Sequence, residues 1–284
     1  MKKNLILISQ IIGILLMFII LQNIIPYLGA ILLAMFYKFP LSQISTYRFI
    51  QVENHQYSFL VLYIFEILGE ILPIIILYYI FRLNKKVIIM KNSLKKKLSA
   101  YSIGYVIILS IGFSIFNFVI INTILLGVSI TYKLSPITSE QILKLLPEML
   151  TAGIIAPVIE EFLFRGVIFE ILRNKFKAKI SIIIQALIFG IMHAFDGGPT
   201  SLYIILHVIS TFVFGLIFAN LLIETKSFYS NILSHILNNI MAICIFPLIV
   251  PRYYNTYVYL IISIILLLIS FAMHKKFKIK NKDF

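Results

Sequence analysis

SLYIILHVISTFVFGLIFANLLI occupies residues 201–223 and contains no Asp, Glu, Lys or Arg. About 20 apolar residues in a helix are enough to cross the hydrocarbon core of a bilayer. Seven other mostly apolar runs share this character, and they cover residues 4–37, 57–81, 100–128, 140–172, 180–195, 228–250 and 255–273. The sequence therefore predicts an all-α fold, a polytopic integral membrane bundle of about eight transmembrane helices.

The composition excludes several other classes of protein. Apolar residues make up 61% of the 284 residues and charged residues only 13%, whereas soluble domains contain roughly 45–50% apolar residues. This balance excludes a disordered chain, a coiled coil and an ordinary cytosolic enzyme. The single cysteine, Cys244, excludes a disulfide framework and a Cys-based metal site. We expect one transmembrane domain over residues 1–284.

The net charge of +14 lies mostly in the predicted loops. If the N-terminus is cytoplasmic and the spans alternate, 19 of the 25 Lys and Arg residues fall on the cytoplasmic side, 5 fall outside and Arg165 lies within a span. This distribution follows the positive-inside rule and predicts that both termini are cytoplasmic. The charge then lies beside anionic lipid, and we expect no nucleic-acid partner.

Polar residues at matching depth in three spans predict a single buried site. Counted at 1.5 Å per residue from the nearest cytoplasmic basic residue, Glu160, His193 and Asn239 all lie about 20 Å deep. His235 precedes Asn239 by four residues and shares its helix face. Ionisable residues inside a span are costly and are functional candidates by default. A carboxylate, two imidazoles and an amide suit the attack of water on an amide carbonyl.

The two adjacent carboxylates of the fourth span are predicted to differ. Glu161 and Arg165 are spaced i,i+4, so they can pair on one face of the helix. Glu160 lies about 100° away around the helix and does not share that partner. We therefore expect Glu161 and Arg165 to support the site, while Glu160 serves as a general base. His235 and Asn239, side by side, could donate to an oxyanion.

These residues form three short motifs, Glu160-Glu161-x-x-x-Arg165, Phe189-x-x-x-His193 and His235-x-x-x-Asn239. In this order they match the EExxxR, FxxxH and HxxxN motifs of a known family. The segment 140–245 resembles the catalytic core of the CPBP family, the CAAX-protease and bacteriocin-processing enzymes, which are also called the Abi family of intramembrane proteases.

The resemblance implies a helical intramembrane endopeptidase. In such an enzyme Glu160 and His193 would activate water, and His235 with Asn239 would stabilise the tetrahedral oxyanion, with no metal required. One Glu and two His are also a credible zinc set, so zinc held by Glu160, His193 and His235 stays open as an alternative.

The resemblance also implies a hydrophobic or lipidated peptide or protein as substrate, which meets the enzyme in the lipid bilayer. The Ile- and Lys-rich chain is typical of a multi-pass protein of a bacterial plasma membrane. In that setting the resemblance implies peptide or bacteriocin maturation or self-immunity. Two alternatives stay open, a non-catalytic membrane regulator of the same fold and a transporter that uses Glu66 and Glu70 of the second span. His207 has no motif partner and is expected to be a core histidine.

Overall fold

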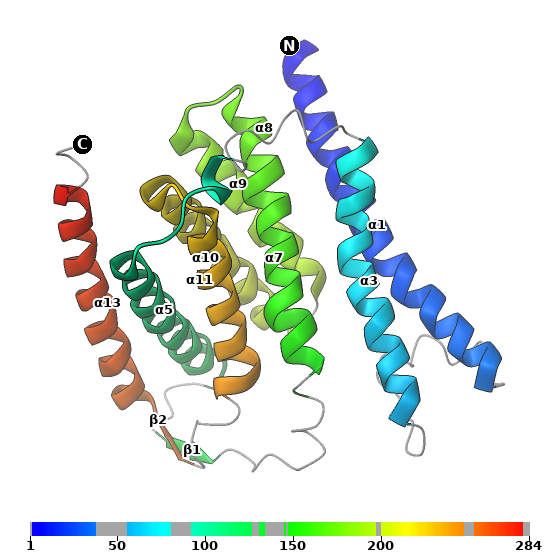
Figure 1. Ribbon diagram of the computed structural model, residues 1–284. Coiled ribbons are helices and arrows are strands. Elements are labelled where there is room, and N and C mark those ends of the chain that lie inside the picture. The colour runs from blue at the N-terminus through cyan, green and yellow to red at the C-terminus, as the bar shows by residue number, and fades with distance from the viewer. Residues whose placement is uncertain are drawn as a thin grey trace. The chain divides into compact units, whose positions relative to one another are not determined.

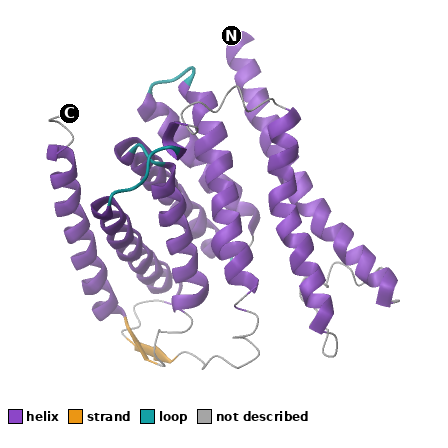
Figure 2. Ribbon diagram, viewed as in Figure 1, coloured by secondary structure: helices purple, strands orange, loops and turns teal. Residues whose placement is uncertain are grey.

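The computed structural model describes residues 2–37, 56–80, 92–126, 131–133, 145, 147–196, 200–246 and 253–280. Contacts within the chain group into two compact units, Met1–Val87 and Ile88–Phe284. The described residues are helical apart from a few connecting residues and two strands of three residues each (Figures 1 and 2). The predicted all-α membrane bundle is thereby confirmed, whereas the single domain over the whole chain stays a prediction.

The first unit is a pair of long helices that pack along each other, α1 (Lys2–Tyr37) and α3 (Gln56–Ile80). The side-chain amide of Gln22 in α1 donates to Glu70 Oε1 in α3 at 2.7 Å. Glu70 therefore has a hydrogen-bond donor from the other helix of its own unit, as a carboxylate inside a span needs. A transport role for Glu66 and Glu70 stays an untested alternative.

The second unit contains the other elements. They are α5 (Ala100–Leu126), β1 (Thr131–Lys133), η3 (Thr151–Ile155), α7 (Ala156–Glu161), η4 (Phe162–Ile168), α8 (Phe169–Arg173), α9 (Ala178–Met192), η5 (His193–Asp196), α10 (Ser201–Thr225), α11 (Phe228–Ile240), η6 (Met241–Ile245), β2 (Tyr253–Asn255) and α13 (Thr256–Lys280). In this unit α5 packs against α13 and α11, α9 packs against α10, and α11 packs against α7 and α10. The strands β1 and β2 pair antiparallel, a short ribbon that the all-α prediction does not include.

Within the described residues, six helical segments are long and apolar enough to cross a membrane, by length and composition. Four of them lie within α1, α5, α10 and α13, and two extend α9 and α11 by a few residues. The helix α3 and the helical stretch of residues 147–173 overlap the two remaining predicted runs, 57–81 and 140–172. The chain is thus a multi-pass membrane protein, while the count of eight spans and the cytoplasmic termini stay predictions. The first residues of the predicted core, 140–144, lie outside the described residues.

The helical stretch that carries Glu160 changes its hydrogen bonding along its length. η3 is a π-helical turn, in which the N–H of Ala156 reaches back to the carbonyl of Thr151, and η4 is a second π-helical segment directly after α7. Pro157 has no N–H, so the carbonyl of Gly153 cannot form the usual α-helical bond. π-helical turns are rare and often occur at functional sites. Glu160 and its neighbour therefore lie on a short α-helical piece between two wider turns.

A glycine contact brings α9 and α10 close together near the end of α9. A Cβ atom on Gly190 would lie 2.8 Å from the carbonyl oxygen of Val208 and 2.9 Å from Phe212 Cβ. The same two helices approach again at Gly215, where a Cβ would lie 2.9 Å from Ala186 Cα. Small residues allow membrane helices to pack at such short distances. The two glycines therefore set the spacing of α9 and α10.

We expect Gly190→Ala to push α10 away from α9 and to lower the free energy of unfolding by about 1–3 kcal/mol, the usual cost of overpacking. His193 lies three residues further along the chain, so its ring should be displaced as well. Gly104→Ala is the matched control, because its Cβ would meet only Met273 Cε at 3.8 Å. Thermal unfolding in detergent compares the two variants, and a wild-type melting temperature for Gly190→Ala would contradict the close contact.

Candidate active site

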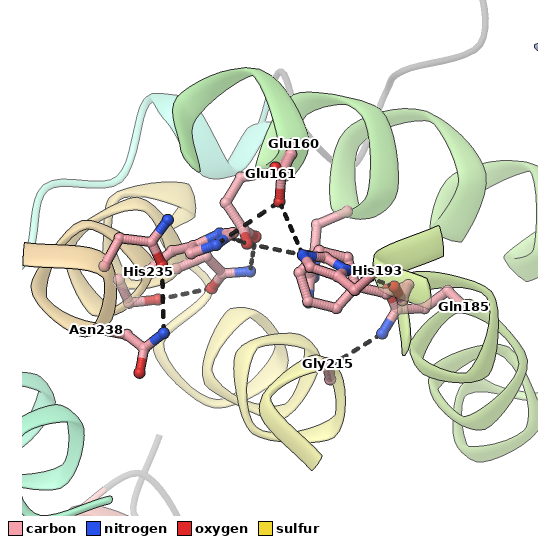
Figure 3. A network of polar contacts seen from close by, with 12 residues as sticks. Glu160, Glu161, Gln185, His193, Gly215, His235 and Asn238 are labelled. Carbon is pink, nitrogen blue, oxygen red and sulfur yellow. Dashed lines mark hydrogen bonds and ion pairs between the residues drawn. The ribbon is translucent and has the colours of Figure 1, made fainter. Parts of the chain in front are cut away.

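Glu160 lies between two histidine rings. Its Oε2 atom is 3.8 Å from Nε2 of His193 and 3.7 Å from Nε2 of His235. The three side chains come from α7, from η5 directly after α9, and from α11, and their polar atoms converge on one point (Figure 3). The side chains of Glu160 and His193 are 20% and 16% exposed, whereas that of His235 is 4% exposed. The structure thus brings together three predicted site residues, two of them partly exposed.

In each ring, the partner of Nδ1 determines whether Nε2, the nitrogen that faces Glu160, carries a hydrogen. Nδ1 of His193 lies 2.7 Å from the carbonyl oxygen of Phe189, and because a carbonyl only accepts, Nδ1 is the donor. Nδ1 of His235 lies 2.9 Å from Glu161 Oε1 and donates to that carboxylate. In a neutral imidazole the other nitrogen, Nε2, then carries a lone pair. Both rings, when neutral, therefore turn a hydrogen-bond acceptor toward Glu160.

Glu161 is the centre of a buried charge network. Its carboxylate and the guanidinium of Arg165 are both 0% exposed and lie 2.9 Å apart, so the i,i+4 pair predicted from the sequence is present. The other oxygen, Oε2, accepts a hydrogen bond from the side-chain amide of Asn231 at 3.3 Å. Together with His235, three groups satisfy this carboxylate, which a buried charge requires to offset its desolvation. The network fixes the orientation of the His235 ring through its Nδ1 atom.

Aromatic rings surround the guanidinium of Arg165. Its Cζ atom lies 4.3 Å from the ring centroid of Phe189, 5.1 Å from that of Phe218 and 5.9 Å from that of Phe164. A cation over an aromatic face gains about 0.5–2 kcal/mol. Phe189, the first residue of the second motif, thus contacts Arg165 through its ring and His193 through its carbonyl.

Two hydrogen bonds to protein groups hold the side chain of Asn239. Its Nδ2 donates to the carbonyl of Ala152 in η3 at 2.8 Å, and its Oδ1 accepts from Nδ2 of Asn238 at 3.2 Å. A carboxamide has two N–H hydrogens. One of them is therefore committed to η3, and only the second is available for the donor role expected from the sequence.

Two further residues lie at the site without belonging to the motifs. Asn231, the amide partner of Glu161, precedes His235 by four residues, as His235 precedes Asn239. This repeat of polar residues on one face of α11 is a signal that the sequence carries. His207, expected to be a core histidine, has its ring 5.6 Å from that of His193, so it borders the site.

A zinc site would use the same donors. Two imidazoles and a carboxylate are zinc ligands, and a second-shell carboxylate or carbonyl on the far ring nitrogen is typical of such sites. Among the residues that the structure describes, however, no group of three or more His, Cys, Asp or Glu side chains is arranged to hold a metal ion. Zinc stays an untested alternative, and the chemistry proposed below uses the side chains alone.

Comparison with known proteins gives a family match over the segment that forms this site. Residues 142–241 match the family described as Type II CAAX prenyl endopeptidase Rce1-like. The matched segment contains all three motifs and ends one residue after α11. A search of the curated proteins found no match, and a search of the solved structures found none.

Proposed function

We infer that this chain is an intramembrane endopeptidase. Its residues 142–241 match the Rce1-like CAAX endopeptidase family, which confirms the resemblance seen in the motifs. It hydrolyses a peptide bond in a membrane-associated peptide or protein. The observation that carries the proposal is the position of Glu160 Oε2 between Nε2 of His193 and Nε2 of His235, at 3.8 and 3.7 Å. These distances are longer than direct hydrogen bonds, and Oε2 of Glu160 and the two Nε2 atoms face a shared point.

Water is activated between Glu160 and His193. Both offer an acceptor, so a water molecule that donates one O–H to each turns a lone pair of its oxygen outward, toward a substrate carbonyl. Glu160 takes the proton as the water oxygen bonds to the carbonyl carbon. The same carboxyl group then gives this proton to the leaving nitrogen as the C–N bond breaks. Glu160 thereby ends each turnover in the state in which it began.

His235 and Asn239 stabilise the oxyanion that forms on the carbonyl oxygen. Asn239 contributes its second amide hydrogen, because the first is bonded to Ala152. His235 donates through Nε2 as an imidazolium, with its Nδ1 hydrogen kept on Glu161. In that state the positive charges of His235 and Arg165 balance the negative charges of the two adjacent glutamates of α7. The site then has no net charge inside the low-dielectric bundle. Donors aimed at the developing oxyanion are often the largest single term in catalysis.

The surroundings of the site indicate the class of substrate. His193 and His235 lie in segments that are long and apolar enough to cross a membrane, so we propose that a substrate reaches Glu160 from the membrane rather than from bulk water. We propose a hydrophobic or lipidated peptide, or the tail of a membrane-associated protein, in a bacterial plasma membrane. Maturation of a peptide or bacteriocin, or self-immunity, is the proposed setting.

Cleavage of a mixed peptide library tests the proposed function. The purified protein in detergent is incubated with short hydrophobic and lipidated peptides, and products are identified by mass spectrometry. A Glu160→Gln preparation made in parallel reports contaminating proteases. New products that appear with the wild type alone support the endopeptidase. If no library member is cleaved by folded protein, the proposal is contradicted and a regulator of the same fold is favoured.

Addition of a metal chelator is expected to leave the activity unchanged. The described side chains form no metal-binding group, and the water is held by Glu160 and His193 directly. The measurement is the rate of cleavage of one identified peptide before and after incubation with excess chelator and gel filtration. A loss of activity that added zinc restores would contradict this mechanism and favour the zinc alternative.

A further inference from the structure

We propose that α5 positions the side chain of Asn239 through Ser114 and Asn238, which makes Asn238 a positioning residue of the site. The inference rests on the proposed function and adds residues to it. Ser114 belongs to α5 (Ala100–Leu126), which lies outside the matched segment 142–241. The contact of Ser114 with Asn238 therefore connects a helix from outside that segment to Asn239, the proposed oxyanion donor.

A polar stripe on α5 faces the helices of the site. Three polar residues of this apolar helix are spaced i, i+4 and i+7 and therefore share one face. Each of them is hydrogen-bonded to a polar residue of α10 or α11. The pairs are Ser110 with Ser234 at 2.6 Å, Ser114 with Asn238 at 3.0 Å, and Asn117 with Ser210 at 2.7 Å. The middle pair is the one that reaches Asn239.

The last acceptor of the hydrogen-bond chain determines the direction of every bond in it. The carbonyl of Ala152 can only accept, so the NH₂ group of Asn239 faces it and Oδ1 of Asn239 faces the other way. That oxygen accepts from the NH₂ group of Asn238, at 3.2 Å. The Oδ1 atom of Asn238 in turn accepts from the hydroxyl of Ser114, at 3.0 Å. A flip of either carboxamide would set oxygen against oxygen.

This chain restricts rotation of the carboxamide of Asn239. The terminal torsion of an Asn side chain is broad when nothing holds it. Here one end of the amide is held by α11 itself and the other by η3. An oxyanion donor is effective when it is already oriented before the reaction. Asn238 therefore acts on catalysis through Asn239, without contact to the substrate.

Asn238→Asp tests the direction of the chain with almost no change in size. An ionised aspartate still accepts from Ser114, but it cannot donate to Asn239. We expect kcat to fall at least tenfold with KM little changed, up to the limit of about 10²–10³-fold that loss of the donor itself in Asn239→Ala would cause. The double variant Asn238→Asp/Asn239→Ala should lose no more than Asn239→Ala alone, since the two residues act as one unit.

Asn117→Asp is the matched control. It places the same substitution on the same polar stripe, but the oxygen of Asn117 is already an acceptor, for the hydroxyl of Ser210. The aspartate keeps that hydrogen bond, and kcat should stay at the wild-type value. A fall in kcat equal to that of Asn238→Asp would show that a buried negative charge, rather than the lost donor, is responsible.

A second readout does not depend on proteolysis. In protein labelled with [¹⁵N]asparagine, the side-chain NH₂ signals of Asn239 are identified by their absence in Asn239→Ala. We expect Asn238→Asp to shift these signals and to speed their hydrogen exchange, while Asn117→Asp leaves them in place. If the wild type cleaves nothing, the proposed function fails and this spectrum alone decides the inference. Unchanged Asn239 signals in Asn238→Asp, or additive losses of kcat in the double variant, would overturn it.

Discussion

Replacement of Glu160 by glutamine is expected to lower kcat by about 10³-fold or more, within the range by which general acid–base catalysis accelerates reactions. Glutamine keeps the size of the side chain but cannot take the proton from water. Its NH₂ group would also donate to Nε2 of His193, which the attacking water needs as its acceptor. The side chain of Glu160 is 20% exposed, so the change should cost little stability.

The control for this prediction is Glu148→Gln, the same substitution at an exposed position in the same helical stretch. It should keep both the wild-type kcat and the wild-type melting temperature. Steady-state kinetics on one identified peptide provides the comparison, with thermal unfolding of each variant to show that it is folded. Activity of folded Glu160→Gln within a few-fold of the wild type would exclude Glu160 as the general base.

The second large effect is expected from Glu161→Ala, as a loss of stability. Arg165 is 0% exposed, and this change would leave its charge among aromatic rings without a counter-ion. Breaking a buried ion pair by removal of one partner typically costs about 3–5 kcal/mol. His235 and Asn231 would lose their acceptor at the same time. We therefore expect a much lower melting temperature, together with loss of activity because the ring of His235 is no longer fixed.

The double variant Glu161→Ala/Arg165→Met separates the charge from the other contacts. It removes both charges, and replacement of a whole buried pair by apolar groups is often close to neutral. Its melting temperature should therefore lie above that of Glu161→Ala, while activity stays lost. Thermal unfolding in detergent measures the difference. If the double variant is less stable than Glu161→Ala by the full cost of Arg165→Met, the two charges are not coupled in the way described.

Most of the membrane architecture could be predicted from the sequence, because an apolar helix in lipid needs no distant partner to satisfy its backbone. The predicted run 57–81 differs from α3 by one residue at each end, and the run 201–223 lies within α10. The π-helical turns around Glu160 were beyond such prediction. They depend on how each turn packs, and Pro157 signals a disturbance without specifying its form. The pairing of β1 with β2 joins residues far apart in the chain and leaves no periodic pattern.

The site was predictable where its contacts are local. The pair of Glu161 and Arg165 follows from their i,i+4 spacing. The equal depth of Glu160 and His193 in their spans predicted that these two residues share a site. The bond from His235 to Glu161 spans 74 residues, and the bond from Ser114 to Asn238 spans 124. Such pairs depend on helix packing and rotation, which no local spacing encodes. The spacing therefore predicted one partner of Glu161, whereas the structure shows three, Arg165, Asn231 and His235.

The central claim is that water held by Glu160 and His193 attacks the peptide carbonyl directly. A single turnover in H₂¹⁸O, with the full-length protein in excess over a peptide that it cleaves, tests this claim most directly. Mass spectrometry of the new carboxyl terminus reads the origin of its oxygen. Direct attack predicts one ¹⁸O atom in the first product formed. A first product that carries only ¹⁶O would show that the oxygen came from a protein carboxylate, and would contradict the account.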